Sequence, residues 1–118
     1  MKLIDLLAAR KTLSDLSNRD DILAKLSYWM TKFVIQTDGE AESYDASLNK
    51  ILSKYGESGE QGTTIRKENI AEAQAEIDSL NSTEVEAPTI RFKLSDLSDI
   101  NLTMKQIYSL FPFIDEDQ

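Results

Sequence analysis

The amino-acid sequence predicts a mostly helical α+β fold, built as a long antiparallel helical hairpin with a small strand–helix–strand unit and a C-terminal helix docked on it. Three patterns lead to this prediction. Apolar residues recur at helical spacing over residues 20–55, a leucine-rich segment precedes that stretch, and apolar residues alternate with basic ones at residues 90–94. The length of 118 residues suits one domain, residues 1–118.

The longest predicted element is a helix over residues 20–55. Its apolar positions lie three or four residues apart with one gap, and they form a single stripe: Ile22, Leu26, Trp29, Phe33, Tyr44, Leu48, Ile51 and Tyr55. At about 1.5 Å per residue, this helix would span roughly 54 Å. Gly39 is its weakest point, because glycine inside a helix costs about 1 kcal/mol relative to alanine. The helix either continues or breaks there, and the spacing of the stripe favours continuity.

A first helix is predicted over residues 2–17. Its apolar face consists of five leucines: Leu3, Leu6, Leu7, Leu13 and Leu16. Ser17 and Asn18 favour a stop, and the two aspartates after Arg19 suit the positive end of the next helix dipole. A tight turn between the helices then lays the leucine face on the longer helix, so we expect residues 1–55 to form a helical hairpin.

Residues 56–64 are predicted to be a flexible loop, because they hold three of the four glycines and no apolar side chain. A short strand at residues 63–66, a helix over 67–81 and an alternating strand over 85–94 follow. These three elements make up the strand–helix–strand unit. Two strands alone are marginally stable, so the long helix is expected to back them.

The last predicted helix begins at Thr103, because Gln106 follows at the spacing of a capping box, and Pro112 limits it. Residues 65–114 are therefore expected to form the α/β unit, and residues 115–118 an acidic tail. The apolar run at residues 107–114 either folds back as a cap on the core or stays exposed as a docking peptide or oligomer contact.

The composition argues against most enzyme chemistry. The chain has no cysteine and no histidine, which removes disulfides, zinc–thiolate sites, thiolate nucleophiles and the usual general base. We therefore expect no catalytic residues, no metal site and no cofactor. The sequence shows no run of eighteen apolar residues and no signal-peptide pattern, which predicts a cytoplasmic protein without a membrane span.

Charge is distributed unevenly along the chain, whose net charge is −8. Residues 1–36 carry six basic and four acidic residues, whereas the remaining 82 residues carry seven basic and seventeen acidic ones. A nucleic-acid-binding surface needs the opposite sign, so direct binding of DNA or RNA is not expected. A protein partner fits better, and a homodimer remains an alternative because a helical hairpin can exchange between two copies.

Three features supply candidate partner contacts. Trp29 and Phe33 share the apolar stripe and are expected in the core, whereas Tyr28 lies about 100° away on the helix and is expected at the surface. Three glutamates four residues apart predict an acidic ridge, which serves as a solvated helix face or meets a basic groove. The third feature is the C-terminal apolar and acidic segment. The candidates are Tyr28, Glu68, Glu72, Glu76, Phe111, Phe113, Asp115, Glu116 and Asp117.

Short segments spread along nearly the whole chain resemble a family of small, uncharacterised proteins of phages and prophages of Gram-positive bacteria. The segments are Met1-Lys2-Leu3-Ile4-Asp5 with Ala9-Arg10, Lys54-Tyr55-Gly56, Glu68-Asn69-Ile70, Ser82-Thr83-Glu84-Val85, and Leu94-Ser95-Asp96-Leu97 before Leu102-Thr103. The family carries only a domain-of-unknown-function label. The resemblance implies a phage setting, and hence the cytoplasm of an infected bacterium, but no site residues.

These observations predict a non-enzymatic, phage-encoded protein-interaction module that acts as an accessory or chaperone in virion assembly. An alternative is an acidic inhibitor of a host nucleic-acid-binding defence protein, similar to an anti-CRISPR protein that mimics nucleic acid. A second alternative is a metal-dependent hydrolase that uses carboxylates, for which Mg²⁺, Mn²⁺ or Ca²⁺ should raise the melting temperature.

Overall fold

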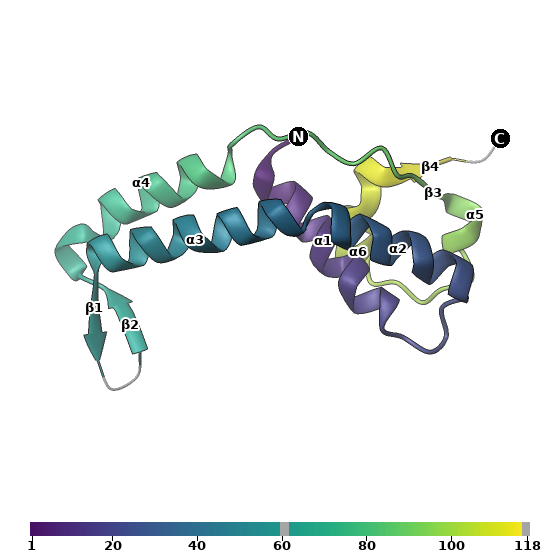
Figure 1. Ribbon diagram of the computed structural model, residues 1–118, viewed down its shortest axis with the longest axis horizontal. Helices are drawn as coiled ribbons and strands as arrows, with labels where there is room; N and C mark the ends of the chain where they lie inside the picture. The colour runs from purple at the N-terminus through teal and green to yellow at the C-terminus, as the bar shows by residue number, and fades with distance from the viewer. Residues whose placement is uncertain (60–61, 117–118) are drawn as a thin grey trace.

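The computed structural model describes residues 1–59 and 62–116 and confirms the mostly helical α+β class (Figure 1). The molecule is elongated, with extents of 53 × 30 × 25 Å. A compact end is formed by residues 1–36 and 84–116, and an arm formed by residues 38–81 projects from it. Within the described parts of the chain, no helix is long and apolar enough to cross a membrane.

The elements of the compact end come from both ends of the sequence. The first two helices form an antiparallel pair, and the C-terminal elements pack beside them (Figure 1). In chain order these elements are α1 (Leu3–Ser17), α2 (Ala24–Gln36), β3 (Phe92–Lys93), α5 (Leu94–Leu97), α6 (Met104–Leu110), a 3₁₀ turn η2 (Phe111–Phe113) and β4 (Ile114–Asp115).

The core of the compact end grows from the leucine face of α1. Leu6, Leu13 and Leu16 are fully buried there, at the spacing that places them on one side of the helix. Phe33 of α2 meets Phe113 edge to face, with 4.8 Å between the ring centroids. The predicted hairpin of the first two helices is thus present, and the C-terminal segment closes over it.

The arm is a second antiparallel pair of helices, with a β-hairpin at its far end (Figure 1). Its elements are α3 (Asp38–Tyr55), β1 (Gly56–Gly59), β2 (Gly62–Ile65), a 3₁₀ turn η1 (Lys67–Asn69) and α4 (Ile70–Asn81). The predicted end of the long helix at Tyr55 is confirmed, since Gly56 leaves the helix directly into an extended conformation.

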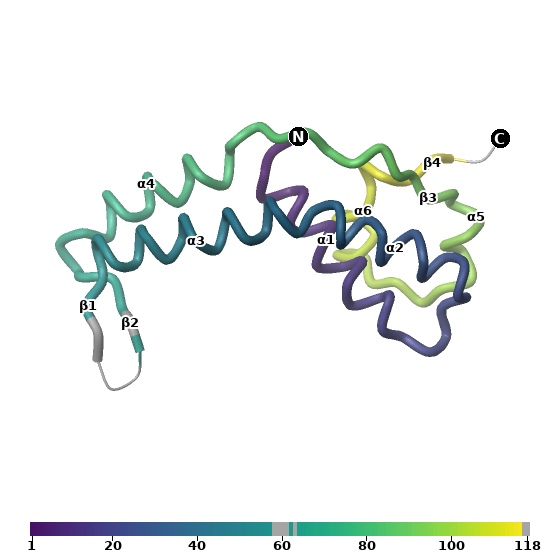
Figure 2. Tube along the Cα trace, viewed as in Figure 1, coloured from purple at the N-terminus to yellow at the C-terminus, as the bar shows by residue number. Residues whose placement is uncertain are grey.

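The predicted long helix is divided at Thr37 into α2 and α3, which run end to end with a bend between them (Figure 2). Thr37 is buried, and its hydroxyl donates to the Phe33 carbonyl at 2.9 Å. The Arg10 guanidinium of α1 donates to the Val34 carbonyl and to the Thr37 hydroxyl, and it pairs with the Asp38 carboxylate at 2.8 Å. The break therefore lies where the Arg10 and Thr37 side chains donate to backbone carbonyls at the end of α2. This point is two residues before Gly39.

The strands pair differently from the prediction. The predicted loop is a β-hairpin in its described part, with Gly56 opposite Ile65 and Gly59 opposite Gly62. Gly62 has a φ of +102°, a backbone conformation that residues with side chains rarely adopt and that glycine tolerates. The flexible loop predicted over residues 56–64 is therefore replaced by paired strands at residues 56–59 and 62–64, and its remaining residues, 60–61, lie outside the described residues.

The strand at residues 85–94 is also much shorter than predicted. Only β3 is a strand there, and it pairs in parallel with β4, so that α4 joins two separate sheets and no strand–helix–strand unit forms. The alternation of Ile90 and Phe92 reflects burial against the core of the compact end, and Leu94 already begins α5. Alternation of apolar and polar residues predicts that one side of an extended segment is buried, but it does not predict which strand pairs with that segment.

We expect Phe33→Ala to lower the free energy of unfolding by about 3–5 kcal/mol, because it leaves a cavity against Phe113. Ile35→Ala on the same helix is the matched control, since Ile35 is exposed and its truncation should change stability by less than about 0.5 kcal/mol. Urea unfolding followed by far-UV circular dichroism measures both values. Equal effects of the two substitutions would contradict the assignment of the core.

Candidate functional site

A row of exposed apolar side chains lies along α6 and the turn after it. Tyr108 is 82% exposed and Phe111 is 66% exposed. Spacings of three, four and seven residues bring them to one face of the helix with two further exposed side chains. We call this set the α6 stripe: Met104, Ile107, Tyr108 and Phe111.

The opposite face of α6 fixes the helix to the core. Leu110 is fully buried there, and the Ser109 and Thr12 hydroxyls share a hydrogen bond of 2.7 Å. The predicted capping box is confirmed. The backbone N–H of Gln106 donates to the Thr103 hydroxyl at 3.1 Å, and the backbone N–H of Thr103 donates to the side-chain oxygen of Gln106 at 2.9 Å. The α6 stripe is therefore presented on an anchored helix.

The predicted C-terminal contacts divide between surface and core. Phe111 belongs to the α6 stripe, but Phe113 is only 1% exposed, which corrects its placement among the surface candidates. The Arg91 guanidinium lies 5.3 Å from the Phe113 ring centroid and covers it on one side. Asp115 and Glu116 are exposed, and Asp117 lies outside the described residues.

The aromatic patch on α2 is also divided. Tyr28 is exposed as expected, whereas Trp29, expected in the core, is 41% exposed. Ile22, Leu26 and Phe33 of the predicted stripe do face the core, but Met30 takes the buried position expected for Trp29. Lys32 holds its ammonium 5.3 Å from the Trp29 ring centroid.

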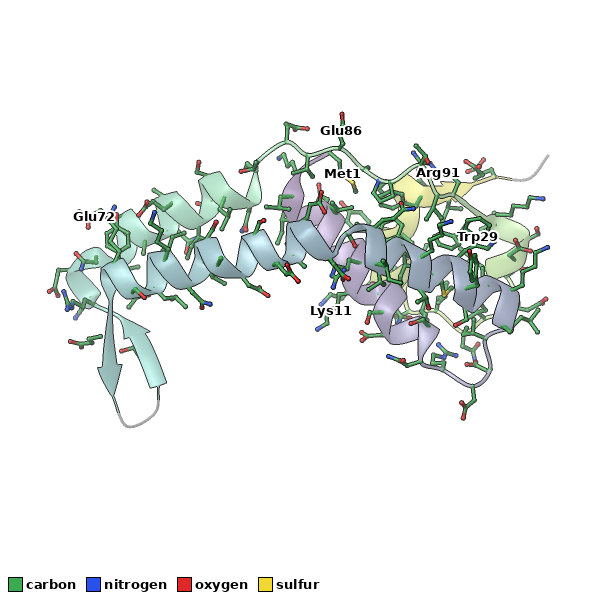
Figure 3. The ribbon with its side chains drawn as sticks, in the orientation of Figure 1. Met1, Lys11, Trp29, Glu72, Glu86 and Arg91 are labelled. Carbon is green, nitrogen blue, oxygen red and sulfur yellow. The ribbon has the colours of Figure 1, made fainter. Side chains whose placement is uncertain are left out.

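The predicted acidic ridge is not continuous. Glu68 and Glu72 are exposed, and Figure 3 shows Glu72 toward the far end of the arm. Glu76 instead faces α3, where its carboxylate lies 3.6 Å from the Lys54 ammonium. A hydrogen bond from the Tyr55 side chain, together with that ammonium, lowers the pKa of Glu76. Positions four apart drift around a helix, and here the drift turns the third glutamate toward its neighbour.

Charge is nevertheless concentrated in the arm. Residues 38–81 hold ten acidic and four basic residues, a net charge of −6 out of −8 for the whole chain. Within the part of the chain that the structure describes, no three acidic side chains come together in a group that could hold a metal ion. The arm therefore offers a diffuse negative surface.

Met104, Ile107 and Tyr108 are not among the named candidate contacts, although residues 107 and 108 belong to the apolar run at 107–114 that is predicted to be a cap or an exposed contact. All three lie one helical turn from another apolar residue, but so does the buried Leu110. Because α6 is apolar on two faces, only the position of α1 decides which face is covered.

Comparison with known proteins yields no relative. No protein-family model matches the chain, no curated protein matches it, and no solved structure matches its fold. What the chain binds is therefore inferred from its own exposed side chains.

Proposed function

We propose that the protein is a non-enzymatic, phage-encoded interaction module that binds a protein partner and acts as an accessory or chaperone in virion assembly. The observation that carries this proposal is the α6 stripe. Aromatic residues and methionine are enriched at the centres of protein interfaces, and Tyr108 and Phe111 are the kind of exposed aromatic side chains that anchor them.

The geometry of the α6 stripe suits a groove on the partner. Apolar side chains at positions i, i+3, i+4 and i+7 of a helix are the pattern by which an amphipathic helix lies in a hydrophobic groove. The buried face of α6 and its capping box already order the helix, so binding does not have to overcome the entropy of folding it. This favours a partner contact that is apolar and little affected by salt.

The double variant Tyr108→Glu/Phe111→Glu should lose the partner, because two charges would be buried in an apolar contact. The measurement is a pull-down with tagged protein from phage-infected and uninfected Gram-positive host lysates, washed at low and at high salt. We expect wild-type protein to retain a virion protein at high salt and the double variant to recover at least about tenfold less of it.

The matched control is Ile35→Glu/Ile70→Glu, which introduces the same charges at two exposed apolar residues outside the α6 stripe. It should recover as much virion protein as the wild type. Equal recovery by the α6 stripe variant would contradict the proposal. A wild-type dimer in sedimentation that the stripe variant converts to a monomer would show that a second copy covers the stripe instead.

The charge of the arm favours a second candidate, the acidic inhibitor of a host nucleic-acid-binding protein. The net charge of −6 over residues 38–81 and the exposed Glu68 and Glu72 supply a negative surface that could occupy a basic groove. Such a contact is governed by electrostatics, so it responds to salt in the opposite way from the α6 stripe.

If the arm binds in this way, Glu68→Lys/Glu72→Lys should abolish the capture of a nucleic-acid-binding protein that wild-type protein holds at low salt and releases at high salt. The control is Asp5→Lys/Asp15→Lys, which makes the same change in net charge on exposed positions of α1. Equal loss of capture in both double variants would show that capture depends on the net charge of the chain and not on the surface of the arm. Capture of the nucleic-acid-binding protein that persists at high salt would contradict the inhibitor hypothesis.

A further inference from the structure

A groove of about 570 Å³ lies between α2 and the segment that runs through β3 to α5. Leu26 and Trp29 line it from α2, and Ile90, Phe92 and Ile100 line it from the other wall. Figure 3 shows Trp29 and Arg91 at this end of the molecule, away from the arm. The groove thus combines an apolar lining with an exposed tryptophan.

The second wall presents the edge of a strand. Residues 90–93 all line the groove, although successive side chains of an extended chain point to opposite faces. Successive residues of an extended segment can all line one groove when the backbone edge of that segment, and not one of its faces, borders the groove. The other edge of β3 is occupied, since Phe92 pairs with Ile114 and Lys93 with Asp115 of β4.

The backbone leading into β3 has hydrogen-bonding groups to offer. Apart from the pairing of β3 with β4, the described backbone groups of residues 86–91 form no backbone–backbone hydrogen bond. The Pro88 and Ile90 carbonyls accept from the guanidinium of Arg91, which bends back along its own strand. Unpaired strand edges are the sites at which extended peptides add to a sheet.

Charges on the walls specify the kind of peptide. Arg91 and Lys93 are exposed, and Lys25 lines the opposite wall on α2. Two acids, Asp96 and Asp99, line the end nearest α5. The Arg19 Nε donates to the Asp21 carboxylate at 2.9 Å, so the charge of Asp21 is already balanced within the chain. Acidic side chains of a ligand are therefore favoured beside β3 and disfavoured at the α5 end.

The strand already paired with β3 shows the complementary pattern. In β4 an apolar residue, Ile114, lies opposite Phe92, and an acidic one, Asp115, lies opposite Lys93. The free edge offers the same alternation of an apolar and a basic residue to a strand on the groove side.

We propose that this groove binds an extended peptide segment with alternating apolar and acidic residues, which adds as a third strand beside β3. Its apolar side chains pack on Trp29 and Leu26, and its acidic side chains lie beside Arg91 and Lys93. This site is separate from the α6 stripe and does not depend on it.

The single tryptophan of the chain, Trp29, reports directly on occupancy. The probe is acetyl-Glu-Val-Glu-Val-Glu-Val-amide, which has no tryptophan of its own. We expect a saturable blue shift of Trp29 emission on titration with this peptide. N-methylation of alternate peptide amides removes the strand hydrogen bonds and should weaken binding at least about tenfold, as should replacement of the glutamates by lysines.

Variants of the protein test the same contact from the other side. Lys25→Glu/Lys93→Glu should weaken binding of the acidic peptide about tenfold or more, whereas Lys105→Glu on α6 and the α6 stripe variant Tyr108→Glu/Phe111→Glu should bind as the wild type does. Urea unfolding confirms that each variant is folded. The absence of a saturable change with wild-type protein, or equal binding of the N-methylated peptide, would overturn the proposal.

Discussion

The packing of Phe113 against Phe33 is the contact on which the compact end depends. It joins the last described turn of the chain to the helix in its first third, so the C-terminal elements are part of the core. Because Phe113 is held there, β4 reaches the edge of β3, and α6 is drawn down onto α1. The placement of this one ring thus goes together with the packing of α6 on α1 and with the pairing of β3 and β4.

The arm has a different physical basis. Its interior contains few buried apolar side chains, chiefly Ile51 and Ala73, and neither belongs to the core of the compact end. Polar contacts also join its helices, such as the hydrogen bond from the Tyr44 hydroxyl to Asn81 at 2.9 Å. A two-helix arm of this kind relies on its attachment, and the contacts of Arg10 around Thr37 provide it at the root of α3.

Sequence patterns predicted the local features well and the long-range ones poorly. The leucine face of α1, the end of α3 at Tyr55 and the capping box of α6 follow from spacing and from residue type at helix ends, and all three are present. The pairing of β3 with β4 joins segments about twenty residues apart, and no local pattern encodes the partner of a two-residue strand.

The candidate contacts were predicted with less success for a related reason. Periodicity places residues on a common face, but only the neighbouring helix determines whether that face is covered. Trp29 and Met30 are adjacent apolar residues, and the position of α1 decides that Met30 is buried and Trp29 is half exposed. The same ambiguity concealed Met104 and Tyr108, which share a short helix with the buried Leu110.

The elongated shape has a consequence for assemblies. The β-hairpin forms the end of the arm, whereas the α6 stripe lies in the compact end, on a helix packed beside α1, in a molecule 53 Å long (Figure 1). The arm and the α6 stripe are thus separate surfaces, and a chain that bound one macromolecule through each of them would raise the effective concentration of each near the other. In that arrangement the protein is a spacer of fixed length, and its reach is set by the number of helical turns in α3.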